Sequence, residues 1–354
     1  MSDLVAGWVE RVRAAGAARS ALRLRGGGTK DFYGGEPRGE LLDTRAHAGI
    51  VNYEPTELVV TARCGTPLAE LEAALAAQGQ MLAFEPPHFG AQATVGGCIA
   101  AGLSGPRRAS AGALRDYVLG VKLLDGKGDV LSFGGQVMKN VAGYDVSRLL
   151  AGSLGILGVI LEVSVKVLPR PTSESTLRFE LPQARAILTL NQWAATPLPI
   201  SASAWRQGQL LLRLSGAEAA VRAAIERLGG DPLPDAEARK LWEGLREQTD
   251  PYFSGDTPLW RLSLPSKAAS IEVEGEQLIE WGGALRWLRT SAAAGAVREA
   301  AHRAGGHATL FRAAEKSAGA FAPLPEVQRR LHRGLKTSFD PQGIFNPGRL
   351  YAEL

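Results

Sequence analysis

The sequence predicts an α+β protein with two domains, and three observations lead to that prediction. Its 354 residues exceed the roughly 250–300 residues at which a single hydrophobic core stops growing. Residues 17–170 combine glycine-rich turns with short β-like runs, whereas strands and helices alternate differently beyond the interruption at 169–173. We therefore expect a first domain over 1–170, a smaller α+β domain over 171–310, and a C-terminal helix with a turn-rich tail over 311–354.

The composition is that of an ordinary soluble globular protein, with 45% hydrophobic and 21% charged residues. No apolar run approaches the roughly 20 residues that span a bilayer, and the N-terminal residues have the pattern of an amphipathic helix rather than a signal peptide. The net charge of +4 is small and the arginines are scattered, which argues against nucleic-acid binding. We expect a cytoplasmic protein with no direct membrane insertion.

In the first domain, β-branched and apolar runs predict strands over 21–24, 58–62, 117–124, 130–133 and 157–168. Asp125-Gly126-Lys127-Gly128 stands between the third and fourth of these runs and indicates a hairpin. Thr66 suits the N-cap and Pro67 the first position of a helix that Gly79 ends.

In the second domain, the same patterns predict strands over 177–180, 201–205, 210–214 and 260–264. Apolar residues at helical spacing predict helices over 184–194, 217–228, 235–247 and 292–304.

The stretch Arg25-Gly26-Gly27-Gly28-Thr29-Lys30 follows the first predicted strand. Glycine amides can approach an anion closely, and successive N–H groups form a concave nest for phosphate oxygens. Thr29 adds a hydroxyl donor and Lys30 a positive charge. The stretch matches neither the G-x-G-x-x-G dinucleotide fingerprint nor the Gly-Lys-Ser/Thr phosphate loop. Taken alone, it fits a flexible glycine turn equally well.

Two further glycine clusters lie at 93–105 and 143–160. Each one alone is typical of tight packing, but the three in this order, with the hairpin between the second and third, are much more specific. With Lys139–Asp145 and the ending Asp340–Arg349, the chain resembles the PCMH-type FAD-binding domain of the vanillyl-alcohol oxidase superfamily. It is most similar to the E subunits of bacterial glycolate oxidases.

The resemblance implies a PCMH-type fold in which two α+β subdomains hold FAD, a smaller α+β cap covers the flavin ring, and the C-terminal tail packs back toward the flavin. Residues at the positions of the family's FAD-binding loops are then expected to contact the cofactor. They are Gly26, Gly27, Gly28, Thr29, Lys30, Thr94, Gly96, Gly97, Gly102, Ser104, Gly105, Gly155, Gly158 and Ile160. For each glycine, a purely structural turn is the alternative.

The FAD is expected to be non-covalent. Covalent members of the superfamily use a histidine or a cysteine, and the first loop has no histidine. Cys64 and Cys98 are the only thiols, and Cys98 fits a small buried helix residue better than a flavin ligand. Two cysteines also cannot hold an iron–sulfur cluster, and the five histidines have no metal-ligand spacing, so we expect no metal.

Oxidation of a 2-hydroxy acid needs a base for the hydroxyl proton and a cation for the carboxylate. His307 and His88 are candidate bases, while Arg312 and Arg349 are candidate cations. The family's histidine-rich motif is incomplete after His307, and a structural role for this histidine is the stronger alternative. Tyr144 is a further candidate beside the ring.

The resemblance implies a flavoprotein subunit that accepts or relays electrons in a glycolate-oxidising complex. Its partners would be a sister FAD subunit and an iron–sulfur subunit, and its substrate a small 2-hydroxy acid. Peripheral association with the inner membrane through a partner would fit this role. Two alternatives stay open: a self-sufficient FAD oxidoreductase of another small acid or alcohol, and a structural assembly subunit.

Overall fold

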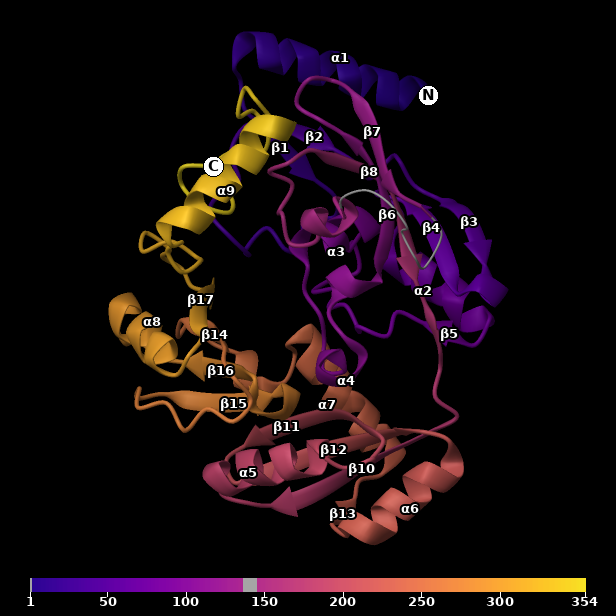
Figure 1. Cartoon of the computed structure of the whole chain (residues 1–354), viewed down its shortest axis with the longest axis vertical. Helices are drawn as coiled ribbons and strands as arrows, with labels where there is room; N and C mark the ends of the chain where they lie inside the picture. The colour runs from indigo at the N-terminus through magenta and orange to yellow at the C-terminus, as the bar shows by residue number, and fades with distance from the viewer. Residues whose placement is uncertain (1, 136–144) are drawn as a thin grey trace.

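The computed structural model describes residues 2–135 and 145–354 (Figure 1). The α-helices are α1 (Asp3–Ala18), α2 (Leu68–Ala77), α3 (Val95–Ala101), α4 (Arg108–Ala111), α5 (Gln183–Ala194), α6 (Glu218–Leu228), α7 (Asp235–Glu247), α8 (Ala294–Arg303) and α9 (Glu326–Phe339). The strands of the first half are β1 (Leu22–Arg25), β2 (Glu40–Asp43), β3 (Ile50–Glu54), β4 (Val59–Arg63), β5 (Gln80–Met81), β6 (Val118–Leu124), β7 (Val130–Gly134), β8 (Val159–Lys166) and β9 (Leu168–Pro169).

The first half of the chain is built on an antiparallel five-stranded sheet in the order β3-β4-β8-β6-β7. Helices α2 and α3 bury their apolar residues against this sheet, and a separate parallel pair, β1-β2, stands beside it. The predicted hairpin is confirmed: β6 pairs with β7, and Asp125 Oδ1 accepts the backbone N–H groups of Lys127 and Asp129, both at 2.9 Å.

The second half forms one eight-stranded antiparallel sheet in the order β13-β10-β12-β11-β15-β16-β14-β17. Its strands are β10 (Ser173–Glu180), β11 (Ile200–Arg206), β12 (Gln209–Gly216), β13 (Asp231–Pro232), β14 (Leu259–Ser263), β15 (Glu276–Glu280), β16 (Leu285–Arg289) and β17 (His307–Arg312). Side chains alternate between the two faces of each strand, so each face carries its own apolar set.

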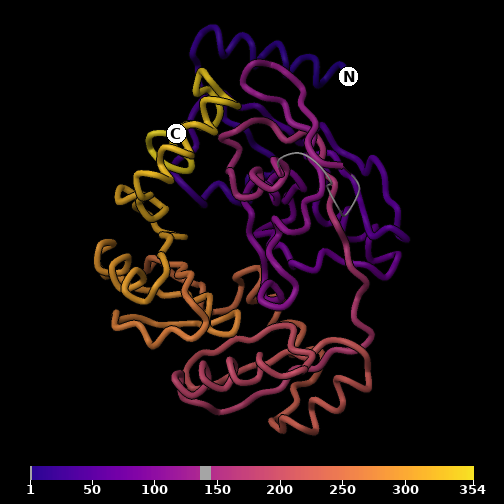
Figure 2. Tube along the Cα trace, viewed as in Figure 1, coloured from indigo at the N-terminus to yellow at the C-terminus, as the bar shows by residue number. Residues whose placement is uncertain are grey.

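The two faces of β14 show this division. Trp260 and Leu262 pack into an apolar cluster with α8, whereas Leu259 belongs to a cluster that includes Ala101 and Leu103 of the first half. One face of the second sheet therefore packs against the first half of the chain. Figure 2 shows the chain crossing to this lower sheet after β9 and returning upward through its C-terminal segment.

The C-terminal segment ends beside the first strand. Phe345 bridges to Leu22 in parallel, and the Leu22 N–H donates to the carbonyl of Ile344 at 2.7 Å. In Figure 1, α9 accordingly lies near β1, although the sequence separates them by most of the chain.

Several local predictions need correction. Helix α2 begins at Leu68 with Pro67 at the N-cap, one residue later than expected. Thr66 is not the cap, because its hydroxyl exchanges hydrogen bonds with the backbone of Gly49 at 2.9 and 3.1 Å. The sequence patterns also missed β15, β16 and β17, which complete the second sheet. The motif at 139–145 and Tyr144 fall outside the described residues, except for Asp145.

Candidate functional site

The glycine loop after β1 packs directly against the turn before α3. A Cβ atom on Gly26 would lie 2.2 Å from Thr94 Oγ1, and one on Gly27 would lie 1.5 Å from the carbonyl oxygen of Gln92. Gly28 has a φ of +72°, which glycine adopts without strain. No side chain fits at the first two positions, so the loop at 26–30 and the turn at 92–94 form one continuous surface.

This surface borders a cavity of about 90 Å³. The lining includes all five loop residues together with the second-loop residues Thr94 and Gly97. Within the described residues, the backbone N–H groups of Gly26, Gly27 and Gly28 donate to no other group of the chain. Because pockets for whole ligands begin at roughly 300 Å³, this cavity suits only part of a dinucleotide.

The cations of the loop are held by neighbouring acceptors. Arg25 Nε donates to Asp31 Oδ2 at 2.7 Å, and Lys30 Nζ donates to the carbonyl of His88 at 3.1 Å. Burial lowers the pKa of the Lys30 ammonium, against the opposing influence of Cys98 and Glu247. Lys30 thus brings a charge to the cavity wall and ties the first loop to the segment around residue 88.

The C-terminal tail fixes the loop from the other side. Asn346 Oδ1 accepts the N–H of Leu24 at 2.8 Å, and its amide nitrogen donates to the carbonyl of Leu154 at 2.7 Å. Arg349 donates to the carbonyls of Tyr33 at 2.7 Å and Asp31 at 3.1 Å, and also to that of Gly35. In this geometry, Arg349 shapes the segment after the glycine loop.

The second predicted loop has two roles. Thr94 caps α3, with its hydroxyl accepting the N–H of Gly97 at 3.3 Å. A Cβ atom on Gly96 would lie 2.6 Å from Cys64 Cβ, so this glycine lets α3 approach the end of β4. Gly97 lines the cavity and Gly96 does not.

The segment after α3 lies at the junction with the second sheet. Gly102 ends α3 with a φ of +64°, and Ser104 Oγ accepts the N–H of Leu114 at 3.0 Å. The carbonyl of Gly105 accepts Trp281 Nε1 at 3.0 Å. Gly105 therefore contacts the second half of the chain directly, whereas the Ser104 hydroxyl bonds within the first half.

The third predicted group is spread along the packing between strands and tail. A Cβ atom on Gly155 would lie 2.7 Å from Asn346 Nδ2, and one on Gly158 would lie 2.6 Å from the carbonyl of Leu124. Ile160 is buried in the core of the five-stranded sheet. All three make tight contacts within the chain and are absent from the lining of the 90 Å³ cavity.

The three predicted catalytic residues lie in different surroundings. Arg312 stacks on Phe32 and Phe89, with its guanidinium carbon 4.4 and 5.2 Å from the ring centres. His307 begins β17 opposite Ser263 and is largely exposed, whereas Arg349 is buried in the tail. Partial burial, with a smaller contribution from Arg261, lowers the pKa of His307.

The thiols and His88 are engaged in the protein interior. Burial raises the pKa of both Cys64 and Cys98 to about 12. His88 Nε2 lies 2.9 Å from Glu72 Oε2, and the carboxylate of Glu247 accepts the backbone N–H of His88 at 3.0 Å.

A second cavity, which no sequence motif indicated, lies between Ser104–Gly105 and the second sheet. Its polar walls include Arg261 and Glu280, and its apolar walls include Trp281 and Trp287. Burial raises the pKa of Glu280 to about 7, although Trp287 Nε1 donates to its carboxylate at 2.8 Å. The sequence predicts the strand that contains Arg261. The face of the sheet on which Arg261 lies depends on how β14 pairs with β16 and β17, which come later in the sequence.

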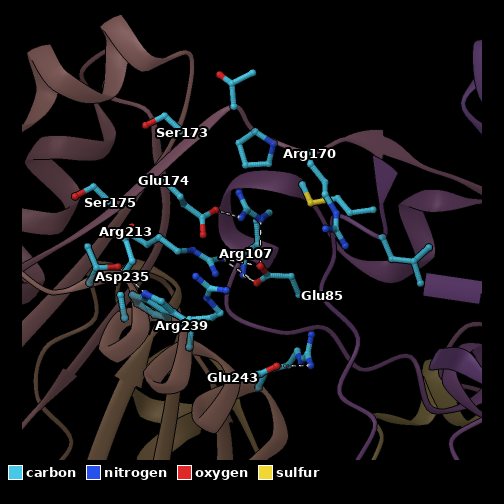
Figure 3. A pocket seen from close by; sticks show the side chains of 18 of the residues that line it. Glu85, Arg107, Arg170, Ser173, Glu174, Ser175, Arg213, Asp235, Arg239 and Glu243 are labelled. Atoms are coloured by element: carbon cyan, nitrogen blue, oxygen red, sulfur yellow. Dashed lines mark hydrogen bonds and ion pairs between the residues drawn. The ribbon is translucent and has the colours of Figure 1, made fainter. Parts of the chain in front are cut away.

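A charged cleft of about 590 Å³ lies on another side of the junction (Figure 3). The carboxylate of Glu85 accepts two hydrogen bonds from Arg213, both at 2.9 Å, and two from Arg107, at 2.9 and 3.3 Å. Arg107 also donates to Glu174 at 2.6 Å. Burial raises the pKa of Glu85, but Arg213 and Arg107 outweigh this effect and lower it overall. These ion pairs join the first half of the chain to β10 and β12.

Within residues 2–135 and 145–354, no three His, Cys, Asp or Glu side chains are placed to hold a metal ion. In the same residues, no helix is long and apolar enough to cross a membrane.

A family model described as an FAD binding domain matches residues 6–134. The Escherichia coli glycolate oxidase subunit GlcE is 51% identical over 98% of this chain and 97% of that protein. The Bacillus subtilis glycolate oxidase subunit GlcD is 29% identical over 69% of this chain and 49% of that protein. Among solved structures, alkyldihydroxyacetonephosphate synthase covers 96% of this chain and 74% of its own, with a TM-score of 0.65 at 16% identity.

The synthase supports the fold alone, and that fold is the predicted α+β flavin-binding class. The matched domain and the GlcE relative also confirm FAD as the cofactor and an FAD-dependent oxidoreductase subunit as the functional class. Since half of its residues are identical over nearly the whole length of both chains, this protein belongs to the family of glycolate oxidase GlcE subunits.

Proposed function

We propose that this chain is the FAD-carrying GlcE subunit of a complex that oxidises glycolate or a related small 2-hydroxy acid. The observation that carries the proposal is the full-length match to GlcE, combined with a side-chain-free cradle at Gly26 and Gly27 in the domain that matches FAD-binding proteins. When bound, FAD supplies a two-electron acceptor.

The residues around the first cavity fit the pyrophosphate of FAD. The free N–H groups of Gly26, Gly27 and Gly28 are suitable donors for phosphate oxygens, and Lys30 is a suitable counter-charge. Gly97 and Thr94 would complete the same cradle. In this proposal five of the other predicted positions shape the backbone around the cofactor: Gly96, Gly102, Gly155, Gly158 and Ile160.

We propose that the flavin is held without a covalent bond. A thiol with a pKa of about 12 is a poor nucleophile at neutral pH, which argues against Cys64 or Cys98 as the attachment point of a covalent flavin. His88 is paired with Glu72 rather than free.

The partners in this proposal are a GlcD-type flavin subunit and an iron–sulfur subunit. The E. coli and B. subtilis relatives are both named as glycolate oxidase subunits, which supports a multi-subunit enzyme. Electrons that reach FAD need an exit, and an iron–sulfur subunit would provide one. Residence in the cytoplasm, with contact to the inner membrane through a partner, is the location that this role requires.

The test compares the isolated chain with the assembled complex. The purified chain should be yellow and oxidise glycolate slowly or not at all, and co-expression with GlcD-type and iron–sulfur subunits should restore turnover. A colourless chain would contradict the flavoprotein role. Rapid glycolate oxidation by the isolated chain with an artificial acceptor would favour the self-sufficient enzyme. Normal activity of a complex whose chain lacks FAD would favour the structural subunit.

A further inference from the structure

A carboxylate from the second half of the chain holds the backbone of the first half beside the glycine loop. Glu247 is the last residue of α7, and its Oε2 accepts the N–H groups of His88 at 3.0 Å and Phe89 at 2.8 Å. Its Oε1 accepts the Nε–H of Arg246 at 2.8 Å, and this bond orients the carboxylate. The Glu247 side chain is 19% exposed, so water competes little for these bonds.

The segment that Glu247 holds has a backbone that needs support. Pro86 and Pro87 have no N–H to donate, and Phe89 has a φ of +54°, which is uncommon for a residue with a side chain. Within the described residues, the N–H groups of His88 and Phe89 donate to no acceptor other than Glu247. Removing the carboxylate would therefore leave two N–H groups without their partner and the left-handed turn at Phe89 without support.

The same segment determines the position of Lys30. The carbonyl of His88 accepts Lys30 Nζ at 3.1 Å, and the ammonium lies 5.5 Å from the centre of the Phe89 ring. Among the described residues, this ammonium donates only to that carbonyl and, at 3.4 Å, to the Thr29 hydroxyl. A Cβ atom on Gly90 would lie 3.2 Å from Thr29 Cγ2, so the segment and the glycine loop are packed side by side.

The charge of Glu247 has two further effects on a phosphate near Lys30, and they have opposite signs. Burial lowers the pKa of Lys30, and Glu247 opposes this change by favouring the protonated ammonium, which helps a phosphate to bind. The same carboxylate repels a phosphate directly. The sign of the change in FAD affinity when Glu247 is removed therefore distinguishes support of Lys30 from simple repulsion.

We infer that Glu247 is a positioning residue for FAD, acting through the backbone of His88 and the ammonium of Lys30. The inference rests on the proposed function and deepens it, because it makes the FAD affinity of the first half depend on a residue of the second half. No residue of α7 lines the 90 Å³ cavity, so the effect on that cavity passes through the His88 segment.

The experiment measures the dissociation constant of FAD by titration of the purified full-length apoprotein. Glu247→Ala should raise this constant about three- to ten-fold, the range of one hydrogen bond, because Lys30 loses the support of the carbonyl that places it. Glu247→Gln keeps the side-chain volume and one acceptor oxygen, so it should recover part of the loss. Glu243→Ala changes an exposed residue one turn earlier on α7 and should leave the constant unchanged.

Two further variants separate positioning of Lys30 from general support of the junction. In a Lys30→Ala chain, Glu247→Ala should have little additional effect, because the group through which it acts is gone. Losses that add up in the double variant would indicate a merely structural role. Glu174→Gln removes the charge of an ion pair with Arg107 between the same two halves, without touching His88, and should leave FAD affinity unchanged.

The results decide between these readings once circular dichroism has shown that the variants are folded. If Glu247→Ala and Glu247→Gln bind FAD as tightly as the unchanged chain, or more tightly, Glu247 does not position Lys30. Equal losses with and without Lys30, or a comparable loss in Glu174→Gln, would also overturn the inference while the flavoprotein role stands. If the alanine variant does not fold, the glutamine variant decides, with an expected increase of about two-fold or more. If the unchanged chain binds no FAD, the proposed function itself fails.

Discussion

Replacing Gly27 with alanine tests the FAD cradle most directly. The new Cβ atom would start 1.5 Å from the carbonyl oxygen of Gln92, and real Cβ atoms keep at least 3.0 Å from such neighbours. The glycine loop must therefore move away from the turn at 92–94 by about 1.5 Å. A shift of this size takes a backbone N–H out of hydrogen-bonding range of a phosphate oxygen.

The expected loss in FAD affinity follows from the number of bonds broken. Hydrogen bonds to charged groups contribute about 1.5–3 kcal/mol each, so losing one or two bonds of about 2 kcal/mol each costs about 2–4 kcal/mol. That free energy corresponds to a dissociation constant about 30- to 700-fold higher. Lys30→Ala should cost less, because it removes one charge and leaves the loop amides in place.

The assay is titration of the apoprotein with FAD, followed by quenching of flavin fluorescence. Gly334→Ala in α9 is the matched control, since a Cβ atom there meets nothing within 4 Å. Circular dichroism establishes that each variant is folded. A folded Gly27→Ala protein that binds FAD as tightly as the unchanged chain would refute the phosphate-cradle assignment.

Three further predictions concern the cofactor, metals and stability. Acid or heat precipitation should leave a colourless pellet and release FAD into the supernatant, and a yellow pellet would reveal a covalent link. Chelators should change neither the FAD content nor the folding of the isolated chain, and a stoichiometric metal lost together with FAD would contradict this. Lys336→Met should lower the free energy of unfolding by about 3–5 kcal/mol, because it leaves buried Asp340, 2.7 Å away, without its partner. Urea unfolding measures that loss, with the exposed Lys127→Met as the control; equal stability of the two variants would show that the buried pair is unimportant.

Local sequence patterns predicted much of the first half, because a few adjacent residues determine the geometry of its turns. The glycines at 26–28 and the Asp125–Gly128 turn specify backbone geometry within a few residues, and the structure places both between the expected elements. The prediction that Thr66 caps α2 was wrong because of a contact that is distant in sequence. The Thr66 hydroxyl bonds instead to Gly49, which is 17 residues away in sequence and adjacent in space.

The second cavity could not be predicted in this way. Arg261 stands in a run of alternating large side chains, and only the pairing of β14 with β16 and β17 determines which face it occupies. Glu280 owes its raised pKa to burial by residues from several distant strands. Both depend on long-range contacts, whereas the three glycine clusters that carry the resemblance to FAD-binding proteins can be seen in the order of the residues alone.

The bond between Asn346 and Leu24 has a consequence for biosynthesis. These residues are 322 positions apart, so the strand that leads into the glycine loop stays without this support until the ribosome has made nearly the entire chain. We therefore expect a chain that is cut short before Asn346 to hold FAD less tightly than the full chain.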